Sequence, residues 1–166
     1  MTSGLQIRPM TAADWPAAAE VYREGIATGD ATFNTEAPSW ESWDRGHLAP
    51  CRLVAVQGGE VVGWTALTPV SDRCVYGGVA ELAVYVAARA RGRGVGRALL
   101  DALVAASEAA GIWSLQAGIF PENAGSVKLH ERAGFRFVGR RERLGQMGGR
   151  WRDVLMFERR SRVVGM

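Results

Sequence analysis

A turn rich in glycine and arginine lies in the middle of the chain, between an apolar strand-like run and an amphipathic helical run. It reads Arg91-Gly92-Arg93-Gly94-Val95-Gly96-Arg97. A helix N-terminus has unpaired backbone N–H groups and a partial positive charge, and both favour a bound phosphate. Glycine lets the backbone approach a ligand closely, and arginine grips phosphate with a planar fork. These residues predict a pyrophosphate-binding turn.

Two common phosphate loops do not fit this turn. The P-loop ends in Gly-Lys-Ser/Thr, whereas this turn ends in Gly96-Arg97-Ala98. The dinucleotide fingerprint needs Gly-x-Gly-x-x-Gly in an opening βα turn, with an acid about twenty residues on. Here the glycines alternate and lie deep in the chain. The glycine spacing alone leaves a simple basic surface turn open as the alternative.

A single carboxylate, Glu81, interrupts the apolar run that precedes the turn. A carboxylate in apolar surroundings has a raised pKa, which suits a general base near neutral pH. Strand alternation, however, puts Glu81 on the side opposite Ala80 and Leu82, as for a surface-facing side chain. Taken by themselves, the residues favour that surface interpretation.

The length and composition describe one ordinary globular domain, which we expect to span residues 1–166. The chain is 48% hydrophobic and 22% charged. No apolar run approaches the roughly 20 residues needed to cross a bilayer. The segment from Met1 to Arg8 lacks the basic start and apolar stretch of a secretory signal. We therefore expect a cytoplasmic protein with no membrane partner.

The charged and metal-ligating residues exclude several other classes of function. The basic residues do not alternate with aromatic ones, so a nucleic-acid partner is not expected. Cys51 and Cys74 are the only cysteines, and His47 and His130 the only histidines. Their separation lacks metal-ligand spacing, so we expect no disulfide, no metal site and no cysteine nucleophile.

Hydrophobic periodicity and turn residues predict seven strands and four helices in one mixed α/β unit. The predicted strands are Leu5–Pro9, Arg52–Gln57, Val61–Thr68, Val79–Val86, Trp113–Ile119, Phe135–Leu144 and Trp151–Glu158. The predicted helices run from Thr11 to about Gly29, and over Trp40–Leu48, Gly94–Ala110 and Asn123–Ala133. One βαβ crossover is clear, from Val79 through the helix at Gly94 to Ile119.

A second motif lies downstream of the turn: Asn123-Ala-Gly-Ser126-Val-Lys-Leu-His130-Glu-Arg-Ala-Gly134-Phe135. Read as Arg91-x-x-Gly94-x-Gly96, the turn resembles the acyl-CoA signature of the GCN5-related N-acetyltransferase (GNAT) superfamily, and the second motif resembles that family's Asn-x-x-Ser/Ala…Leu-Tyr/His-x-x-x-Gly-Phe. The element order also matches, from Ile7 to Glu158. The resemblance implies the GNAT fold, a mixed and mostly antiparallel sheet of about seven strands flanked by four helices. It also implies acetyl-CoA as co-substrate.

A narrower resemblance points to the phosphinothricin acetyltransferase branch. It rests on Ala31-Thr-Phe-Asn-Thr35, Ala80-Glu81-x-x-Val84-Tyr85-Val86, Gly118-Ile119 and Gly149-Arg150-Trp151-x-Asp153. That branch acetylates the α-amine of small amino acids such as phosphinothricin, methionine sulfoximine and methionine sulfone, and it typically forms homodimers. The resemblance therefore implies a small-molecule amine as acceptor and a second copy of the chain as partner.

The resemblance also implies which residues hold acetyl-CoA. The main chain around Tyr85 would pair with the pantetheine arm where parallel strands splay apart, and the pyrophosphate would lie on the amides of the turn. Asn123 would bond the pantetheine. The cofactor-binding residues expected are Val84, Tyr85, Val86, Arg91, Gly92, Arg93, Gly94, Val95, Gly96, Arg97, Asn123 and Ser126.

For catalysis, the resemblance implies Glu81 as the base that takes the proton of the acceptor amine, directly or through water. His130 stands where many relatives have a tyrosine that protonates the departing thiolate, and a helix-packing histidine is the alternative. The substrate-binding residues expected are Phe33, Thr35, Ser71, Asp72, Arg73 and Glu81, with Arg73 gripping a carboxylate or phosphinate. The stretches Tyr76–Val79 and Ala80–Tyr85 depart from the branch pattern, which leaves the named substrate open.

Two alternative functions remain at this stage. The first is acetylation of another amine: a polyamine, an aminoglycoside, a protein N-terminus or a lysine. The second is a non-catalytic module that binds acyl-CoA. Acidic residues look too sparse for a polycation, and Glu81 together with the Asn123 motif argues against the module.

Overall fold

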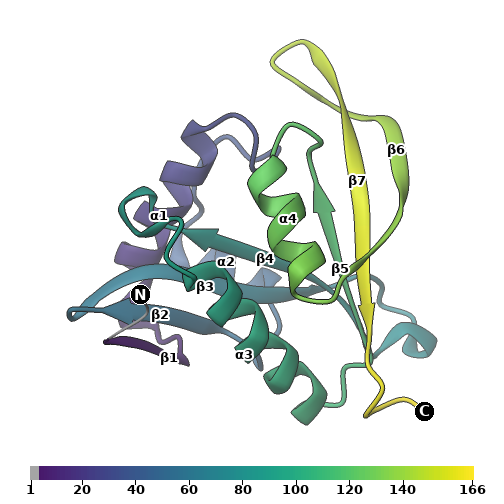
Figure 1. The fold of residues 1–166 in the computed structure, drawn as a ribbon, viewed down its shortest axis with the longest axis horizontal. Helices are drawn as coiled ribbons and strands as arrows, with labels where there is room; N and C mark the ends of the chain where they lie inside the picture. Colours follow the sequence, from purple (N-terminus) through teal and green to yellow (C-terminus); the bar gives the residue numbers. More distant parts are fainter. Residues whose placement is uncertain (1–3) are drawn as a thin grey trace.

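The computed structural model describes residues 4–166, in which a seven-stranded sheet carries the helices (Figure 1). The strands are β1 Leu5–Pro9, β2 Leu53–Gln57, β3 Glu60–Pro69, β4 Val79–Val86, β5 Ser114–Ile119, β6 Arg136–Met147 and β7 Arg150–Arg160. Their spatial order is β1-β2-β3-β4-β5-β7-β6. Every neighbouring pair is antiparallel except β4 and β5. The prediction of a mixed, mostly antiparallel sheet is confirmed.

Four α-helices cover the two faces of the sheet: α1 Trp15–Ala27, α2 Trp40–Gly46, α3 Val95–Ala109 and α4 Ala124–Arg132. Figure 1 shows α3 and α4 in front of the sheet. Two neighbours on β3 explain the division between faces. A Cβ on Gly63 would lie 3.0 Å from Leu99 Cδ1 of α3, whereas the ring of Trp64 packs 5.7 Å from that of Tyr22 on α1. Strand alternation thus gives each face its own helices.

The predicted apolar faces of the helices are buried. On α3, Leu99, Leu100 and Leu103 are fully buried, and on α1, Trp15 and Tyr22 are almost fully buried. Burial of side chains of this size stabilises a fold by roughly 1.5–3 kcal/mol each. The helical spacing of these residues is what makes both helices fold onto the sheet.

The start of α1 is fixed by a carboxylate. A short 3₁₀ turn, Ala12–Asp14, precedes the helix, and the Thr11 N–H donates to Asp14 Oδ2 at 2.8 Å. Arg8 donates to both oxygens of Asp14, each at 2.8 Å. These hydrogen bonds, chiefly those from Arg8, lower the pKa of Asp14 to about 2. The predicted acid three residues after Thr11 therefore acts as a cap.

The two C-terminal strands are longer than predicted. β6 continues to Met147, and β7 extends to Arg160 at its far end. The β6–β7 register shifts between Arg141 and Gly145, and Arg143 has a φ of 47°. This bulge interrupts the side-chain alternation, so the pattern stops although the hairpin continues. The prediction that β6 ends at residue 144 was wrong for this reason.

Residues 4–166 include no helix long and apolar enough to cross a membrane. Within the same residues, no group of three or more His, Cys, Asp or Glu side chains could hold a metal ion. Cys51 is buried and Cys74 exposed, and both are free thiols.

Candidate active site

The central feature of the candidate site is a fork between β4 and β5. Their parallel ladder ends where Glu81 lies opposite Gln116. Beyond that pair, β4 goes on pairing with β3 as far as Val86, while β5 pairs with β7. Figure 1 shows the two strands diverging. One edge of β4 from residue 82 to 86 therefore faces β5 without a strand partner, as the predicted splay requires.

A cavity of about 1410 Å³ opens at this fork. It brings together predicted site residues that are far apart in the sequence. Those that line it are Phe33, Glu81, Val84, Tyr85, Val86, Arg91, Gly92, Gly94, Val95, Gly96, Arg97, Asn123, Ser126 and His130. Those that do not line it are Thr35, Ser71, Asp72, Arg73 and Arg93.

The glycine-arginine turn has the backbone geometry expected of an anion site. Gly92 and Gly94 have φ angles of 75° and 83°, which glycine adopts without strain. Gly94 is the N-cap of α3, and its carbonyl accepts the N–H of Ala98 at 3.0 Å. The amides of the first turn of α3 have no partner inside the helix. They are free for an anion at the mouth of the cavity.

Gly96 and the arginines have distinct positions around this turn. A Cβ on Gly96 would lie 3.0 Å from Leu129 Cδ2, so glycine allows α3 and α4 to approach. Arg91 Nε donates to the carbonyl of Val86 at 3.3 Å. Arg97 pairs with Asp101 at 2.9 Å on the exposed side of α3. Arg91 and Arg97 both line the cavity and give this end of it two positive charges.

Glu81 is half-buried and lines the cavity at the base of the fork. Gln116 Nε2 donates to its Oε1 at 3.4 Å. Strand alternation was correct in placing Glu81 opposite the buried Ala80 and Leu82. However, the Glu81 side chain faces the cavity and not open solvent, because the loop after α1 lies over this face of β4.

Tyr85 lies on the same face of β4 as Glu81. Its ring packs against Tyr22 and Trp64, with centroids 4.8 and 5.1 Å apart, and a Cβ on Gly25 of α1 would lie 2.8 Å from Tyr85 Cδ1. Burial raises the pKa of the Tyr85 phenol, so it stays protonated at neutral pH. Tyr85 thus joins the wall formed by α1.

His130 is 2% exposed, and its Nδ1 lies 2.8 Å from the carbonyl oxygen of Ser126. A carbonyl only accepts, so Nδ1 carries the proton. Burial lowers the pKa of His130, which keeps the ring neutral at neutral pH. Nε2 then has a lone pair, with no hydrogen-bond partner within residues 4–166. In this form Nε2 can accept a proton but has none to donate.

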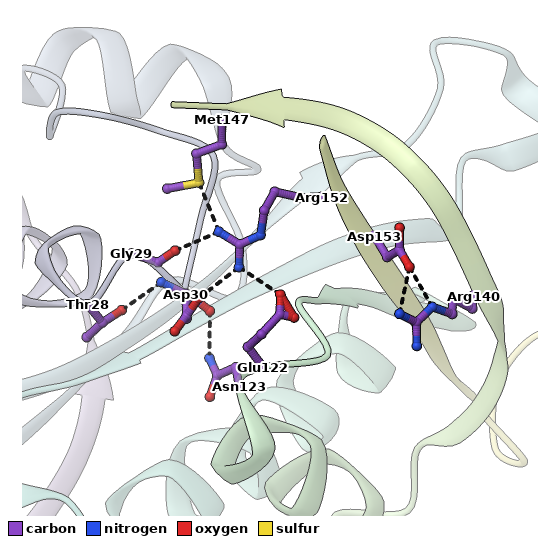
Figure 2. Close-up of polar contacts among 9 residues, drawn as sticks. All are labelled: Thr28, Gly29, Asp30, Glu122, Asn123, Arg140, Met147, Arg152 and Asp153. Carbon is purple, nitrogen blue, oxygen red and sulfur yellow. Dashed lines mark hydrogen bonds and ion pairs between the residues drawn. The ribbon is translucent and has the colours of Figure 1, made fainter. Parts of the chain in front are cut away.

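Asn123 caps α4 and ties it to the loop after α1. Its Oδ1 accepts the Ser126 N–H at 3.2 Å, and its Nδ2 donates to the Asp30 carbonyl at 3.2 Å, as Figure 2 shows for Asp30. The motif that predicted a cofactor contact also encodes this structural connection.

The acceptor end of the cavity differs from the sequence prediction. Arg73 is exposed, and its guanidinium lies 5.6 Å above the ring of Tyr76, within the loop between β3 and β4. Ser71, Asp72 and Arg73 therefore belong to a loop that does not line the cavity. Cavity-lining residues that the sequence analysis missed include Tyr22, Asn34, Thr68, Phe120 and Arg141. Asn34 belongs to the quoted Ala31–Thr35 motif, which was the available signal, but only strand pairing brings Arg141 there.

Comparison with known proteins shows which family combines these features. The model of the acetyltransferase (GNAT) family matches residues 14–135. The phosphinothricin N-acetyltransferase of Streptomyces coelicolor is 32% identical over 166 residues, covering 95% of this chain and 97% of that protein. The L-methionine sulfoximine/L-methionine sulfone acetyltransferase of Pseudomonas aeruginosa is 30% identical over 159 residues, covering 92% of each chain.

A solved structure gives the same answer. A GNAT superfamily phosphinothricin acetyltransferase from Sinorhizobium meliloti, in complex with AcCoA, superposes with a TM-score of 0.83 at 30% identity, over 95% of this chain and 88% of that one. The residues that the family model matches, 14–135, include both the fork between β4 and β5 and the turn that opens α3. This chain is therefore an acetyl-transferring enzyme that belongs to the GNAT family of acetyltransferases.

Proposed function

We propose that this protein transfers an acetyl group from acetyl-CoA to the α-amine of a small amino acid, of the phosphinothricin or methionine sulfoximine/sulfone type. The observation that carries the proposal is the position of Glu81, at the base of the fork and on the wall of the cavity that the α3 turn enters. The names of the full-length relatives support the class of acceptor.

The donor half of the proposal assigns acetyl-CoA to the fork. The free edge of β4 around Val84 and Val86 suits the amide-bearing pantetheine arm, because it can pair as an added strand would. The amides of α3 from Val95 onward, with Arg91 and Arg97, suit the pyrophosphate. Acetyl-CoA supplies the thioester whose acetyl carbon is attacked.

The acceptor amine must be neutral before its nitrogen can attack, and an α-ammonium must therefore lose a proton. Glu81 takes this proton in our proposal, directly or through a water molecule. The hydrogen bond from Gln116 holds one carboxylate oxygen and so orients the group. The new C–N bond forms as the C–S bond breaks, and the thiolate leaves. The nitrogen then gives up its second proton to solvent and the thiolate takes one, so that the products are the N-acetyl amine and the free thiol of CoA.

Of the two roles considered for His130, proton donation to the thiolate and packing of its helix, we assign it to helix packing. A proton donor would need a proton on Nε2, whereas burial and the Ser126 carbonyl favour the neutral ring with its proton on Nδ1. The ring packs edge-on against Phe135, with centroids 5.3 Å apart. A thiolate is a competent leaving group, and it can take its proton from solvent.

For the acidic end of the acceptor we propose Arg141 in place of Arg73. Arg141 lines the cavity from β6, and its register partner Val154 of β7 lines it too. A guanidinium there can bind a carboxylate or phosphinate with two parallel hydrogen bonds. Arg73 is exposed and lies outside the cavity.

We also propose a homodimer that covers part of the β6–β7 hairpin. Large apolar side chains are exposed there, and contiguous exposed apolar surface marks interaction sites. They are Phe137 at 54%, Val138 at 47%, Leu144 at 49% and Trp151 at 56% of their surface.

The deciding experiment measures free thiol released from acetyl-CoA with a panel of amines. The panel contains phosphinothricin, methionine sulfoximine, methionine sulfone, the common amino acids, polyamines and an aminoglycoside. We expect saturable turnover with at least one α-amino acid and none with its N-acetyl derivative. If only polyamines or the aminoglycoside were acetylated, the proposed α-amino-acid acceptor would be wrong. Acetyl-CoA binding with no thiol release from any amine would favour the non-catalytic module.

A further inference from the structure

Arg152 of β7 is a buried cation, only 3% exposed. Its Nη1 donates to the Gly29 carbonyl at 2.9 Å, and its Nη2 donates to Asp30 Oδ1 at 2.8 Å and to Glu122 Oε1 at 3.1 Å (Figure 2). The guanidinium carbon lies 4.0 Å from the centroid of the Phe120 ring. One side chain thus joins the loop after α1 to the connection between β5 and α4.

A buried guanidinium is costly unless its hydrogen bonds are satisfied, because water no longer solvates it. The Nη1 and Nη2 atoms of Arg152 contact four acceptors on three separate segments, the third being the β6–β7 hairpin, where Met147 Sδ lies 3.4 Å from Nη1. Its buried Nε has no hydrogen-bond partner within residues 4–166. The planar fork of arginine can reach several acceptors at once, which lysine cannot match. The arrangement is therefore specific for arginine.

The groups that Arg152 holds form one wall of the cavity. Asp30, Phe120 and Glu122 line the cavity, whereas Arg152 itself lies behind them. Asp30 is held twice, since the Asn123 side chain at the start of α4 donates to its carbonyl. Phe33 extends the wall by packing edge-on against Phe120, with centroids 4.8 Å apart. A change at Arg152 would reach the cavity through these neighbours.

We infer that Arg152 is a positioning residue that fixes the wall formed by residues 30–34 against the start of α4, and so sets the shape of the acceptor end of the cavity. The effect on catalysis rests on the proposed function, whereas the effect on the wall does not. Two kinds of measurement separate these statements.

The first measurement is amide hydrogen exchange in peptides that cover residues 28–35. Arg152→Met removes every hydrogen bond of the guanidinium and keeps an unbranched side chain. We expect amide exchange in this segment to be about tenfold faster than in the native protein, because the segment loses its hydrogen bonds from Arg152. The matched control is Arg140→Met on the adjacent strand, where Arg140 pairs with Asp153 (Figure 2). The control should leave this segment unchanged. Equal exchange in the native and Arg152→Met proteins would overturn the inference, whether or not any acceptor is found.

The second measurement compares the acceptor KM with the Kd of acetyl-CoA. In Arg152→Met, we expect the acceptor KM to rise about tenfold, because a displaced wall misplaces the acceptor, with the Kd of acetyl-CoA within about twofold of the native value. Arg152→Lys keeps the positive charge but lacks the planar guanidinium, so its acceptor KM should lie between those of the native protein and Arg152→Met. An unchanged acceptor KM would contradict a positioning role, and so would equal increases in the acceptor KM and in the Kd of acetyl-CoA.

Glu122→Gln and Asp30→Asn provide the test if Arg152→Met does not fold. Both carboxylates are roughly half-exposed, at 47% and 42% of their side chains, so these variants should fold. Each weakens one contact of the fork, and each should raise the acceptor KM about threefold with unchanged Tm. Native kinetics in both variants would overturn the inference.

Discussion

Glu81 and Gln116 form the last residue pair that joins β4 to β5, and the Gln116 amide donates to the Glu81 carboxylate at 3.4 Å. The strands separate immediately beyond this pair, so the carboxylate lies at the base of the fork and faces the cavity. The break in the ladder therefore does two things. It frees an edge of β4 for an extended ligand, and it leaves a carboxylate beside that edge.

Gly94→Val should weaken acetyl-CoA binding. Gly94 caps α3 with a φ of 83°, which a β-branched residue adopts only with strain. The turn would rearrange and the amides of α3 would lose their orientation, so we expect the Kd to rise about 10- to 100-fold by calorimetry. Gly46→Ala at the end of α2, where a Cβ meets nothing within 4 Å and the residue does not line the cavity, is the control and should bind normally. Tight binding by Gly94→Val would remove the pyrophosphate from this turn.

Gly145→Ala should impair the acceptor without affecting the donor. A Cβ at Gly145 of β6 would lie 2.8 Å from Phe33 Cζ, so the ring must move from its place in the cavity wall. We expect the acceptor KM to rise about tenfold at constant Kd for acetyl-CoA. Gly139→Ala on the same strand meets nothing within 4 Å and should behave as the native enzyme. Equal KM values in the two variants would exclude Phe33 from the acceptor wall.

His130→Gln should lower kcat less than about tenfold, because we assign His130 to packing and not to proton donation. Loss of a general acid would lower kcat by about 10²–10⁴-fold. Glutamine keeps a donor that can reach the Ser126 carbonyl, and the native ring carries its proton on Nδ1. Steady-state kinetics with saturating acetyl-CoA measures the effect. A loss of a thousandfold, with the fold intact by circular dichroism, would restore His130 as the proton donor.

Asp14→Asn should make stability less dependent on pH. Arg8 holds the pKa of Asp14 at about 2, so ionised Asp14 stabilises the fold above its unfolded pKa of 3.8. That stabilisation is lost as the pH falls from about 4 towards 2. We expect the free energy of unfolding at neutral pH to drop by about 2 kcal/mol in the variant, measured by urea denaturation.

The difference between native and Asp14→Asn proteins should shrink steadily below about pH 4. Arg23→Met, which removes an exposed ion pair with Glu20, is the control and should change stability little. A constant difference at every pH would mean that the geometry of the cap matters and its charge does not.

The sequence predicted best what local signals determine. The bounds of β4 were predicted correctly, because an apolar run that only Glu81 interrupts ends at Val86. The ends of α3 were predicted within a residue, since Gly94 and Gly111 both adopt positive φ angles that stop a helix. The bulge around Arg143 has no such signal, so the length of β6 was missed.

The candidate site shows the same division. The turn at α3 is continuous in sequence and was predicted from its residue types. Arg152 and Asp30 are 122 residues apart, and nothing near either predicts their ion pair. Arg141 and Arg73 are both basic residues near turns, and only the pairing of β6 with β7 brings Arg141 to the cavity. Contacts between distant segments thus determine which arginines line the cavity.

The most direct test of the central claim is Glu81→Gln, measured by kcat and by the Kd of acetyl-CoA in the same preparation. The amide cannot take the proton of the acceptor amine, so kcat should fall about 10²–10⁴-fold. The Kd should stay within about twofold of the native value, because the carboxylate lies at the base of the fork and away from the α3 turn. A kcat near the native value, or an equal loss of kcat and acetyl-CoA binding, would contradict the role of Glu81 as the base.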